Sequence, residues 1–539
     1  MANPAAKWHP VTNSSVVFCL FLLLLAMVLY TLYQDPTFNE KPDKYYTALL
    51  TFATIVAGWL AIPGASGLLD VLVRPVQRSP FHALLIVSVV ALAVFGLFAK
   101  FVLDAFPNSG DEVSYIQQAQ TYARGRLWVD PPAVAEAFRQ YWFFDKDGKW
   151  VGYFAPGWPL VMTPFFLLGL PLWIVNPLIG AASLPAFFVL ARQYVSRQSA
   201  WLGMLLLGLS AFFIFNSGSY FSHSVTAFYG ILFAICGAKY FAKGKWRYAL
   251  AAGACIGLMG VTRTQNAVIF AAVFAAALLL TSRRRKGFLW FCLGGLPFFV
   301  TLLMFQDSVT GNALLPVQQW LRPEPFTMPS MSNFQMMEWH FAELATWTSP
   351  LLVLGFGAAL IDLFRTGRLD FADWIMPVTI VSLLAYHDYG GNQYGPRYYF
   401  EAWPMAMLTM LKVIDPVLFG VERVRLKPWL SSAVIASLVF ELAYLAACTH
   451  REHLVVMERQ DLYRQVERAG LNNAVVIVAG STGKTRPMAP RDLVRNGLDV
   501  SDRKVIYALD RPEIYDELRA QYPGRSIYVY SGAQLNSAR

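Results

Sequence analysis

The chain consists of apolar runs of about 20 residues separated by short polar segments. The first run, SSVVFCLFLLLLAMVLYTLY, extends from Ser14 to Tyr33. The hydrocarbon core of a bilayer is about 30 Å thick, and a helix of about 20 apolar residues crosses it. The 539 residues are 56% hydrophobic and only 14% charged, with a mean hydropathy of +0.43. We therefore expect an integral membrane protein. The first run is long, lacks a small-residue cleavage site and precedes further spans, so we do not expect a cleaved signal peptide.

The net charge of +10 does not indicate a nucleic-acid-binding protein. Lysine and arginine are concentrated in short segments between apolar runs, which is typical of loops that stay on the cytoplasmic side. The five cysteines lie in or at the ends of apolar runs without metal-ligand spacing, so we interpret them as core residues. The basic segments contain Arg74/Arg78, Arg192/Arg197, Lys239–Arg247, Arg283–Lys286, Arg365/Arg368 and Arg423–Lys427.

With these segments inside, the pattern predicts about 13 transmembrane helices, with the amino terminus inside and the carboxyl terminus outside. The apolar stretch 158–170 is predicted not to cross, because a span there would put Arg192 on the outer side; it suits a short interfacial or re-entrant helix. The predicted spans are 14–33, 45–63, 81–103, 174–191, 199–216, 219–238, 247–262, 264–281, 288–305, 346–363, 371–387, 398–413 and 429–447.

Three regions follow from this topology: a helix pair in 1–80, a transmembrane domain in 81–447, and a small soluble α/β domain in 450–539 on the outer side. The outward loops are 104–157 and 306–345. In the tail, NNAVVIVAG, RKVIYAL and RSIYVYSG are predicted strands, with helices at 491–497 and 512–522. The segment GSTGKT is not a phosphate-binding loop, because Val478 stands where the first glycine is required.

The first outer loop opens with two adjacent acids, Asp111 and Glu112, followed by Tyr115 on what could be the same helical face as Asp111. One interpretation is structural: Ser109 or Asp111 caps a surface helix, and its positive amino end favours the acids. The other is chemical: one carboxylate removes a proton from an acceptor hydroxyl. This pattern alone leaves both interpretations open.

The spacing DExxY at these three positions resembles the first-loop motif of GT-C glycosyltransferases, especially the protein O-mannosyltransferase and lipid A aminoarabinose transferase group. The resemblance covers about residues 80–415; an extra helix pair precedes it, and the carboxyl-terminal domain is small. The supporting motifs are YFAPGWPLVMTPFFLLG at Tyr153–Gly169, LARQYVSR, TRTQN at Thr262–Asn266 and GPRYYFEAWP.

The resemblance implies a polyprenyl- or dolichyl-phosphate sugar donor, with Asp111 as general base. It implies that Glu112 is a supporting acid that orients a hydroxyl, tunes the base or helps to hold a cation; which of the two transfers the proton is left open. A divalent cation could bind their oxygens, although the sequence identifies no third ligand and no other cofactor is expected.

A phosphate leaving group needs positive charge nearby. Arg397 and Arg263 are the predicted phosphate-binding residues; the alternatives are an interfacial arginine and a tight turn. His223 is a predicted donor to sugar or phosphate, or else a hydrogen-bonded loop residue. Tyr153 and Trp158 could stack on a sugar or flank the lipid chain, as could any interfacial aromatic residue. Tyr115 joins them as a substrate-binding residue.

The resulting hypothesis is a glycosyltransferase of a bacterial inner membrane, with its site facing the periplasm. It would move a sugar from the lipid-phosphate donor to a lipid, glycan or protein hydroxyl, with inversion. Its partners would be donor, acceptor and membrane lipids, and no nucleic acid. The alternatives are a transporter or flippase of a lipid-linked glycan, which should show repeated halves, and a scaffold whose tail recruits partners.

Overall fold

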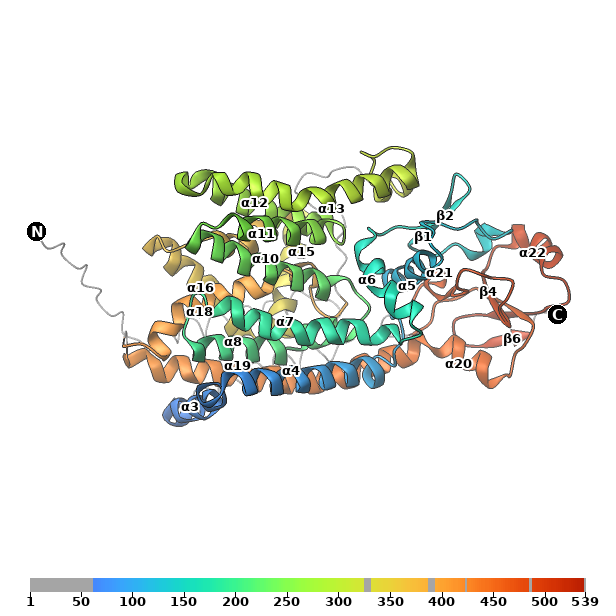
Figure 1. The fold of residues 1–539 in the computed structure, drawn as a ribbon. Helices are drawn as coiled ribbons and strands as arrows, with labels where there is room; N and C mark the ends of the chain where they lie inside the picture. The colour runs from blue at the N-terminus through green and yellow to red at the C-terminus, as the bar shows by residue number, and fades with distance from the viewer. Residues whose placement is uncertain (1–61, 324–330, 386–392, 422–423, 484–486, 538–539) are drawn as a thin grey trace, which may run out of the picture.

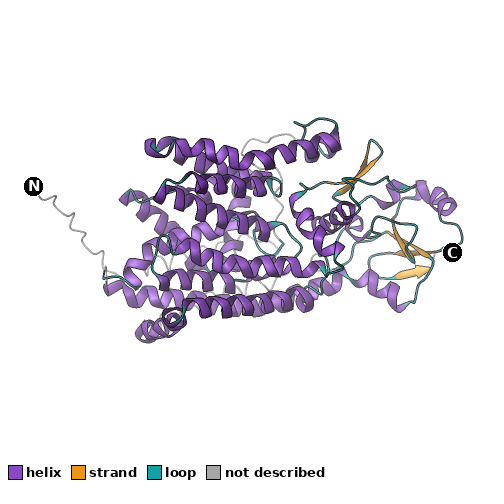
Figure 2. Ribbon diagram, viewed as in Figure 1, coloured by secondary structure: helices purple, strands orange, loops and turns teal. Residues whose placement is uncertain are grey.

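The structure is a computed structural model that describes residues 62–323, 331–385, 393–421, 424–483 and 487–537. These residues form an elongated bundle of helices with a smaller mixed region at one end (Figures 1 and 2). We call this end the sheet end, because it holds both β-sheets of the described residues.

The helices of the bundle are built from the apolar runs of the sequence. Within the described residues, five spans are long and apolar enough to cross a membrane, or seven if two bent helix pairs are each counted as one. The chain is therefore an integral membrane protein. The bundle helices are α3 (Ile62–Arg78), α4 (Pro80–Leu97), α7 (Val175–Ala191), α8 (Arg197–Leu209), α9 (Ala211–Gly218), α10 (His223–Lys243), α11 (Trp246–Gly260), α12 (Thr264–Leu280), α13 (Lys286–Thr310), α15 (Met331–Trp347), α16 (Pro350–Thr366), α17 (Phe371–Leu383), α18 (Trp403–Leu418) and α19 (Lys427–Arg459).

Glycines allow some of these helices to approach closely. A Cβ atom on Gly253 of α11 would lie 1.9 Å from the carbonyl oxygen of Phe291 on α13. A Cβ atom on Gly294 would lie 1.9 Å from the carbonyl oxygen of Leu250. Small residues are typical of helix interfaces in membranes, where backbone contact replaces the hydrophobic driving force.

The predicted count of 13 spans stays a prediction. The span 14–33 and all but two residues of 45–63 lie outside the described residues. The span 199–216 is broken into α8 and α9, which meet at 60°. The prediction that 306–345 is a loop was wrong in part, because α15 occupies its second half and turns by 117° into α16.

Two predicted helix boundaries also differ. Helix α18 begins at Trp403 rather than at 398, because residues 397–399 form a 3₁₀ turn and Pro404 suits the first turn of a helix. Helix α19 continues past the predicted boundary at 447 to Arg459. The polar residues after this boundary also have a helical propensity, so nothing in the local sequence ends the helix there.

The sheet end combines the first loop with the carboxyl-terminal residues (Figure 1). The stretch 158–170 is not a full span: it forms the 11-residue helix α6. The first-loop elements are α5 (Gly110–Ala123), the antiparallel strands β1 (Phe143–Lys146) and β2 (Lys149–Gly152), and α6 (Gly157–Leu167).

The three predicted strands of the tail are present and, together with β6, which was not predicted, form a four-stranded sheet with the order β4-β3-β5-β6. Strands β4 and β5 both run parallel to the buried central strand β3, and β6 pairs antiparallel with β5. The domain boundaries stay a prediction. The elements are α20 (Asp461–Arg468), β3 (Ala474–Val478), α21 (Pro490–Leu493), β4 (Val505–Leu509), α22 (Tyr515–Gln521), β5 (Ser526–Tyr530) and β6 (Leu535–Ser537).

The carboxyl-terminal sheet shares its hydrophobic core with the first loop. Phe138 and Trp150 of that loop belong to the same buried cluster as Val476 of β3 and Ile506 of β4. Because a common core is buried only when both parts are in place, the sheet and the first loop support each other.

Candidate functional site

Helix α5 presents the two predicted acids at its amino end. Ser109 precedes the helix, and its Oγ accepts a hydrogen bond from the backbone N–H of Glu112 at 3.3 Å. Asp111 and Glu112 therefore both lie in the first turn, where the helix dipole favours negative charge. The structural interpretation is confirmed for the cap at Ser109 and wrong for the surface helix, because most residues of α5 are buried. The cap does not exclude a chemical role for the acids.

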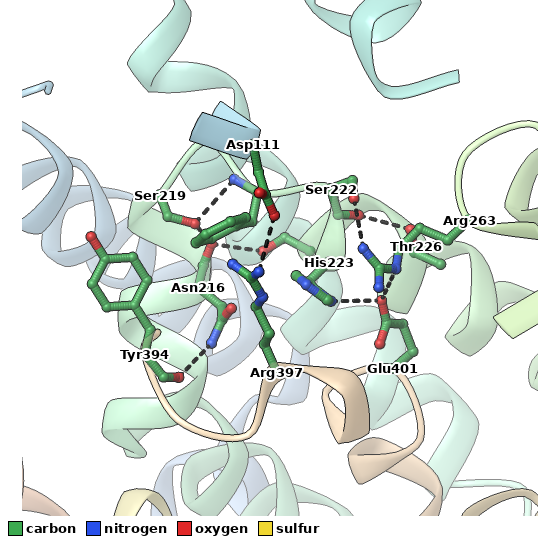
Figure 3. Close-up of polar contacts among 12 residues, drawn as sticks. Asp111, Asn216, Ser219, Ser222, His223, Thr226, Arg263, Tyr394, Arg397 and Glu401 are labelled. Carbon is green, nitrogen blue, oxygen red and sulfur yellow. Dashed lines mark hydrogen bonds and ion pairs between the residues drawn. The ribbon is translucent and has the colours of Figure 1, made fainter. Parts of the chain in front are cut away.

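Asp111 forms an ion pair with Arg397, 286 positions later in the chain. Its Oδ2 lies 3.0 Å from Nη2 of Arg397, and Figure 3 shows the two side chains facing each other. Arg397 belongs to the 3₁₀ turn η5 (Arg397–Tyr399), and its guanidinium carbon lies 4.0 Å from the ring centre of Phe221. The two residues predicted to share one site are therefore in contact. Their chemical roles stay predictions.

Glu112 points in a different direction from its neighbour and is fully buried. Its Oε2 accepts the backbone N–H of Asn108 at 2.6 Å, and its Oε1 accepts that of Tyr220 at 2.9 Å. Burial raises the pKa of Glu112 to about 7, although the two N–H donors and Arg397 act against the rise. Glu112 thus joins the loop before α5 to the loop after α9.

This arrangement does not favour a metal ion shared by the two acids. Both carboxylate oxygens of Glu112 already accept backbone hydrogen bonds. Within the part of the chain that the structure describes, no group of three or more histidine, cysteine or carboxylate side chains could hold a metal ion. The divalent cation at these two acids stays a prediction.

A second polar cluster lies beside the first and centres on Glu401, a buried carboxylate (Figure 3). Its Oε1 lies 2.9 Å from Nδ1 of His223 and 3.2 Å from Nε of Arg263. Arg263 also donates from Nη1 to the hydroxyl of Ser222 at 3.3 Å. The predicted residues Arg263 and His223 are thus brought together by an acid that was not predicted.

Tyr115 connects the two clusters. Its hydroxyl lies 3.1 Å from Oγ of Ser222, the same atom that Arg263 contacts. Burial raises the pKa of Tyr115 to about 12, so it is a neutral hydroxyl at neutral pH. A path of polar contacts therefore runs from α5 through Ser222 and Arg263 to Glu401.

The predicted aromatic residues occupy different positions. Trp158 is buried, and its Nε1 donates to the carbonyl oxygen of Tyr220 at 2.7 Å. It supports the loop after α9 and has no exposed face for a sugar, so this prediction is corrected. Tyr153 is half-buried and packs against Trp142, with 4.6 Å between ring centres.

Sequence reasoning missed Glu401 and Ser222. Glu401 is the only acid in the motif GPRYYFEAWP and lies four residues after Arg397. An acidic residue just before an apolar helix could have indicated a polar cavity. Ser222 carried no such signal, because serine is common in loops. Only the fold places it between Tyr115 and Arg263.

The sequence matches no protein-family model and no curated protein. Solved structures are similar to it. The crystal structure of ArnT from Cupriavidus metallidurans in the apo state has a TM-score of 0.53 and 13% identity, covering 84% of this chain and 93% of that one. The structure of that ArnT bound to undecaprenyl phosphate has a TM-score of 0.52, also at 13% identity, covering 83% and 92%.

The archaeal oligosaccharyltransferase AglB from Archaeoglobus fulgidus, in complex with an inhibitory peptide and a dolichol-phosphate, has a TM-score of 0.46 and 12% identity. The match covers 75% of this chain and 62% of AglB. This chain thus spans less than two thirds of that protein. The likeness to ArnT extends over most of both chains, and at 13% identity it shows the fold alone. The chain therefore has the fold of ArnT, and the GT-C resemblance of its sequence motifs predicted a fold of this kind.

Proposed function

We propose that the protein is a glycosyltransferase that moves a sugar from a polyprenyl-phosphate donor to a hydroxyl group, with inversion at the anomeric carbon. The observation that carries this proposal is the contact between Asp111 and Arg397, which pairs a carboxylate with a cation at the end of a membrane bundle. The fold supports it, because ArnT with the same fold was crystallised with undecaprenyl phosphate.

The reaction requires a base near the attacking hydroxyl and a cation near the departing phosphate. Asp111 accepts the proton of the acceptor hydroxyl, whose oxygen attacks the anomeric carbon. The bond from that carbon to the phosphate oxygen breaks, and its electron pair stays on the phosphate. The products are the glycosylated acceptor, polyprenyl phosphate and a proton, which Asp111 releases to water.

Arg397 stabilises the negative charge that develops on the phosphate. A guanidinium can donate two parallel hydrogen bonds to phosphate oxygens, and without the donor it pairs with Asp111 instead. Arg263 adds a second positive charge, which Glu401 holds in place. Glu112 positions Asp111 by tying the start of α5 to the loop after α9.

The proposed location is a bacterial inner membrane with the sheet end in the periplasm. The basic segments of the sequence favour this orientation, because they fall at alternate connections between the predicted spans. In that orientation the donor's isoprenoid chain stays in lipid, while its phosphosugar meets Asp111 near the membrane surface.

Replacement of Asp111 tests the proposal. We expect Asp111→Asn to lower sugar transfer from a labelled polyprenyl-phosphate sugar by about 10² to 10⁴, the range for loss of a general base. The matched control is Asp130→Asn, which removes a 90% exposed carboxylate from the same loop. It should retain wild-type transfer.

Transfer by Asp111→Asn at the wild-type rate would refute the base assignment. A wild-type protein that moves a lipid-linked sugar across the bilayer without transferring it would favour the transporter instead. Labelling that puts the first loop in the cytosol would refute the orientation.

A further inference from the structure

Two side chains from distant parts of the chain flank the residue that precedes Asp111. A Cβ atom on Gly110 would lie 2.3 Å from Oδ1 of Asp492 and 3.2 Å from Cβ of Tyr141. Tyr141 belongs to the first loop, and Asp492 to α21 of the carboxyl-terminal region. Both side chains therefore lie against the residue that precedes the proposed base, and the glycine leaves space for them.

Tyr141 is the outermost member of a row of aromatic rings. Its side chain is 41% exposed, and its ring centre lies 4.8 Å from that of the half-buried Trp142. The row continues through Phe154, 5.8 Å from Trp142, to Tyr115, a further 4.5 Å away. Aromatic rings thus extend from the polar cluster of the site to the surface.

Asp492 is an acceptor without a donor. Among the described residues, its side chain has no hydrogen bond, and Oδ1 is buried. Burial raises its pKa to about 6; the nearby Asp111 adds to the rise, while Arg495 and Arg459 oppose it. Asp492 is therefore mostly ionised at neutral pH and has unused capacity to accept hydrogen bonds.

The backbone around these residues is held from both sides. Gln140 donates from Nε2 to the carbonyl oxygen of Val494 at 2.8 Å, which joins the first loop to the segment after α21. Ser114 on α5 donates from Oγ to the carbonyl oxygen of Trp142 at 2.9 Å. These bonds hold the backbone next to Tyr141 and Asp492 in place relative to α5.

We propose that Tyr141, Trp142 and Asp492 form the acceptor subsite and that the acceptor is a carbohydrate. This inference rests on the proposed transfer reaction and specifies its substrate class. A sugar ring has an apolar C–H face that packs on an aromatic ring and hydroxyl groups that donate to a carboxylate. A hydroxyl of a ring bound in this way lies next to Asp111.

The same chemistry argues against a peptide acceptor. A peptide that binds by strand addition is held by backbone hydrogen bonds along a strand edge. The subsite instead presents flat rings and an acceptor carboxylate. Recognition of a carbohydrate through an aromatic platform and one charged acceptor fits the groups that lie beside Gly110.

The first experiment measures binding to the full chain in lipid nanodiscs by saturation-transfer NMR. The probes are a panel of methyl glycosides and a short peptide containing serine and threonine. The variants are Tyr141→Leu, which removes the flat ring but keeps an apolar side chain, and Asp492→Asn. The controls are Trp246→Ala, a 53% exposed aromatic residue outside the sheet end, and Asp516→Asn, an exposed acid.

We expect at least one glycoside to receive saturation from the wild type and from both controls. In each test variant its signal should fall at least about fivefold. With that glycoside as acceptor, Asp492→Asn should raise KM by about tenfold, the effect of losing a charge-assisted hydrogen bond, and Tyr141→Leu should raise it by up to about tenfold through loss of the stacked ring. Neither variant should change kcat by more than about twofold. Retained binding of polyprenyl phosphate shows that the variants are folded.

Glycoside signals and acceptor KM values unchanged in both variants would overturn the subsite. A signal from the peptide that depends on Tyr141 would overturn the carbohydrate assignment. If the wild type neither binds polyprenyl phosphate nor transfers sugar while the glycoside signal still depends on Tyr141, the proposed function fails and the carbohydrate site stands.

Discussion

Glu112 offers a test of the site through pH and stability. The buried carboxylate has a pKa of about 7 in the folded protein, against 4.5 for an ordinary glutamate. Between these pH values the folded state holds a proton that the unfolded state releases. The free energy of unfolding should therefore fall as pH rises through this window. The rise in pKa corresponds to a loss of about 3 kcal/mol by pH 7 and above.

Glu112→Gln removes this titration and mimics the protonated side chain. It keeps one carbonyl acceptor for the N–H groups of Asn108 and Tyr220, which both bond to the carboxylate in the wild type. Relative to the wild type, the variant should gain about 3 kcal/mol between pH 4.5 and 8. The control Glu136→Gln, at a side chain that is 56% exposed, should follow the wild-type curve.

The assay is denaturant unfolding of the purified protein in one detergent at several pH values, followed by tryptophan fluorescence. Parallel pH curves for Glu112→Gln and the wild type would refute the reasoning. A wild type that gains stability over the variant as pH rises would show that the two backbone N–H donors outweigh burial. The folded pKa of Glu112 would then lie below 4.5.

Two further predictions concern the residues on either side of Asp111. Arg397→Ala should lower kcat by about 10² to 10³, as expected for loss of a group that stabilises developing charge. Arg397→Lys should restore part of the lost kcat. Equal kcat values for the wild type and the alanine variant would remove Arg397 from the phosphate site. Gly110→Ala should destabilise the protein by about 1 to 3 kcal/mol, because Asp492 must move away, and acceptor KM should rise as well. Gly357→Ala, where no atom lies within 4 Å of the added carbon, is the control for both measurements.

The sequence alone determined the features that depend on local pattern. Apolar runs of bilayer length predicted spans such as α4, α7 and α10. Apolar segments rich in β-branched residues predicted the strands β3 to β5. Serine before two acids predicted the start of α5. Each of these signals involves residues a few positions apart, so it can be recognised without knowing the rest of the fold.

Tertiary structure decided which of these residues meet. Asp111 and Arg397 could be proposed as partners, but only the packing of α5 against the turn before α18 brings them to 3.0 Å. The roles of the two adjacent acids also differ for a tertiary reason, since Glu112 turns inward to the Tyr220 loop. Asp492 lies beside Gly110 because the carboxyl-terminal sheet shares a core with the first loop. Such contacts depend on burial between segments hundreds of residues apart, which no local pattern encodes.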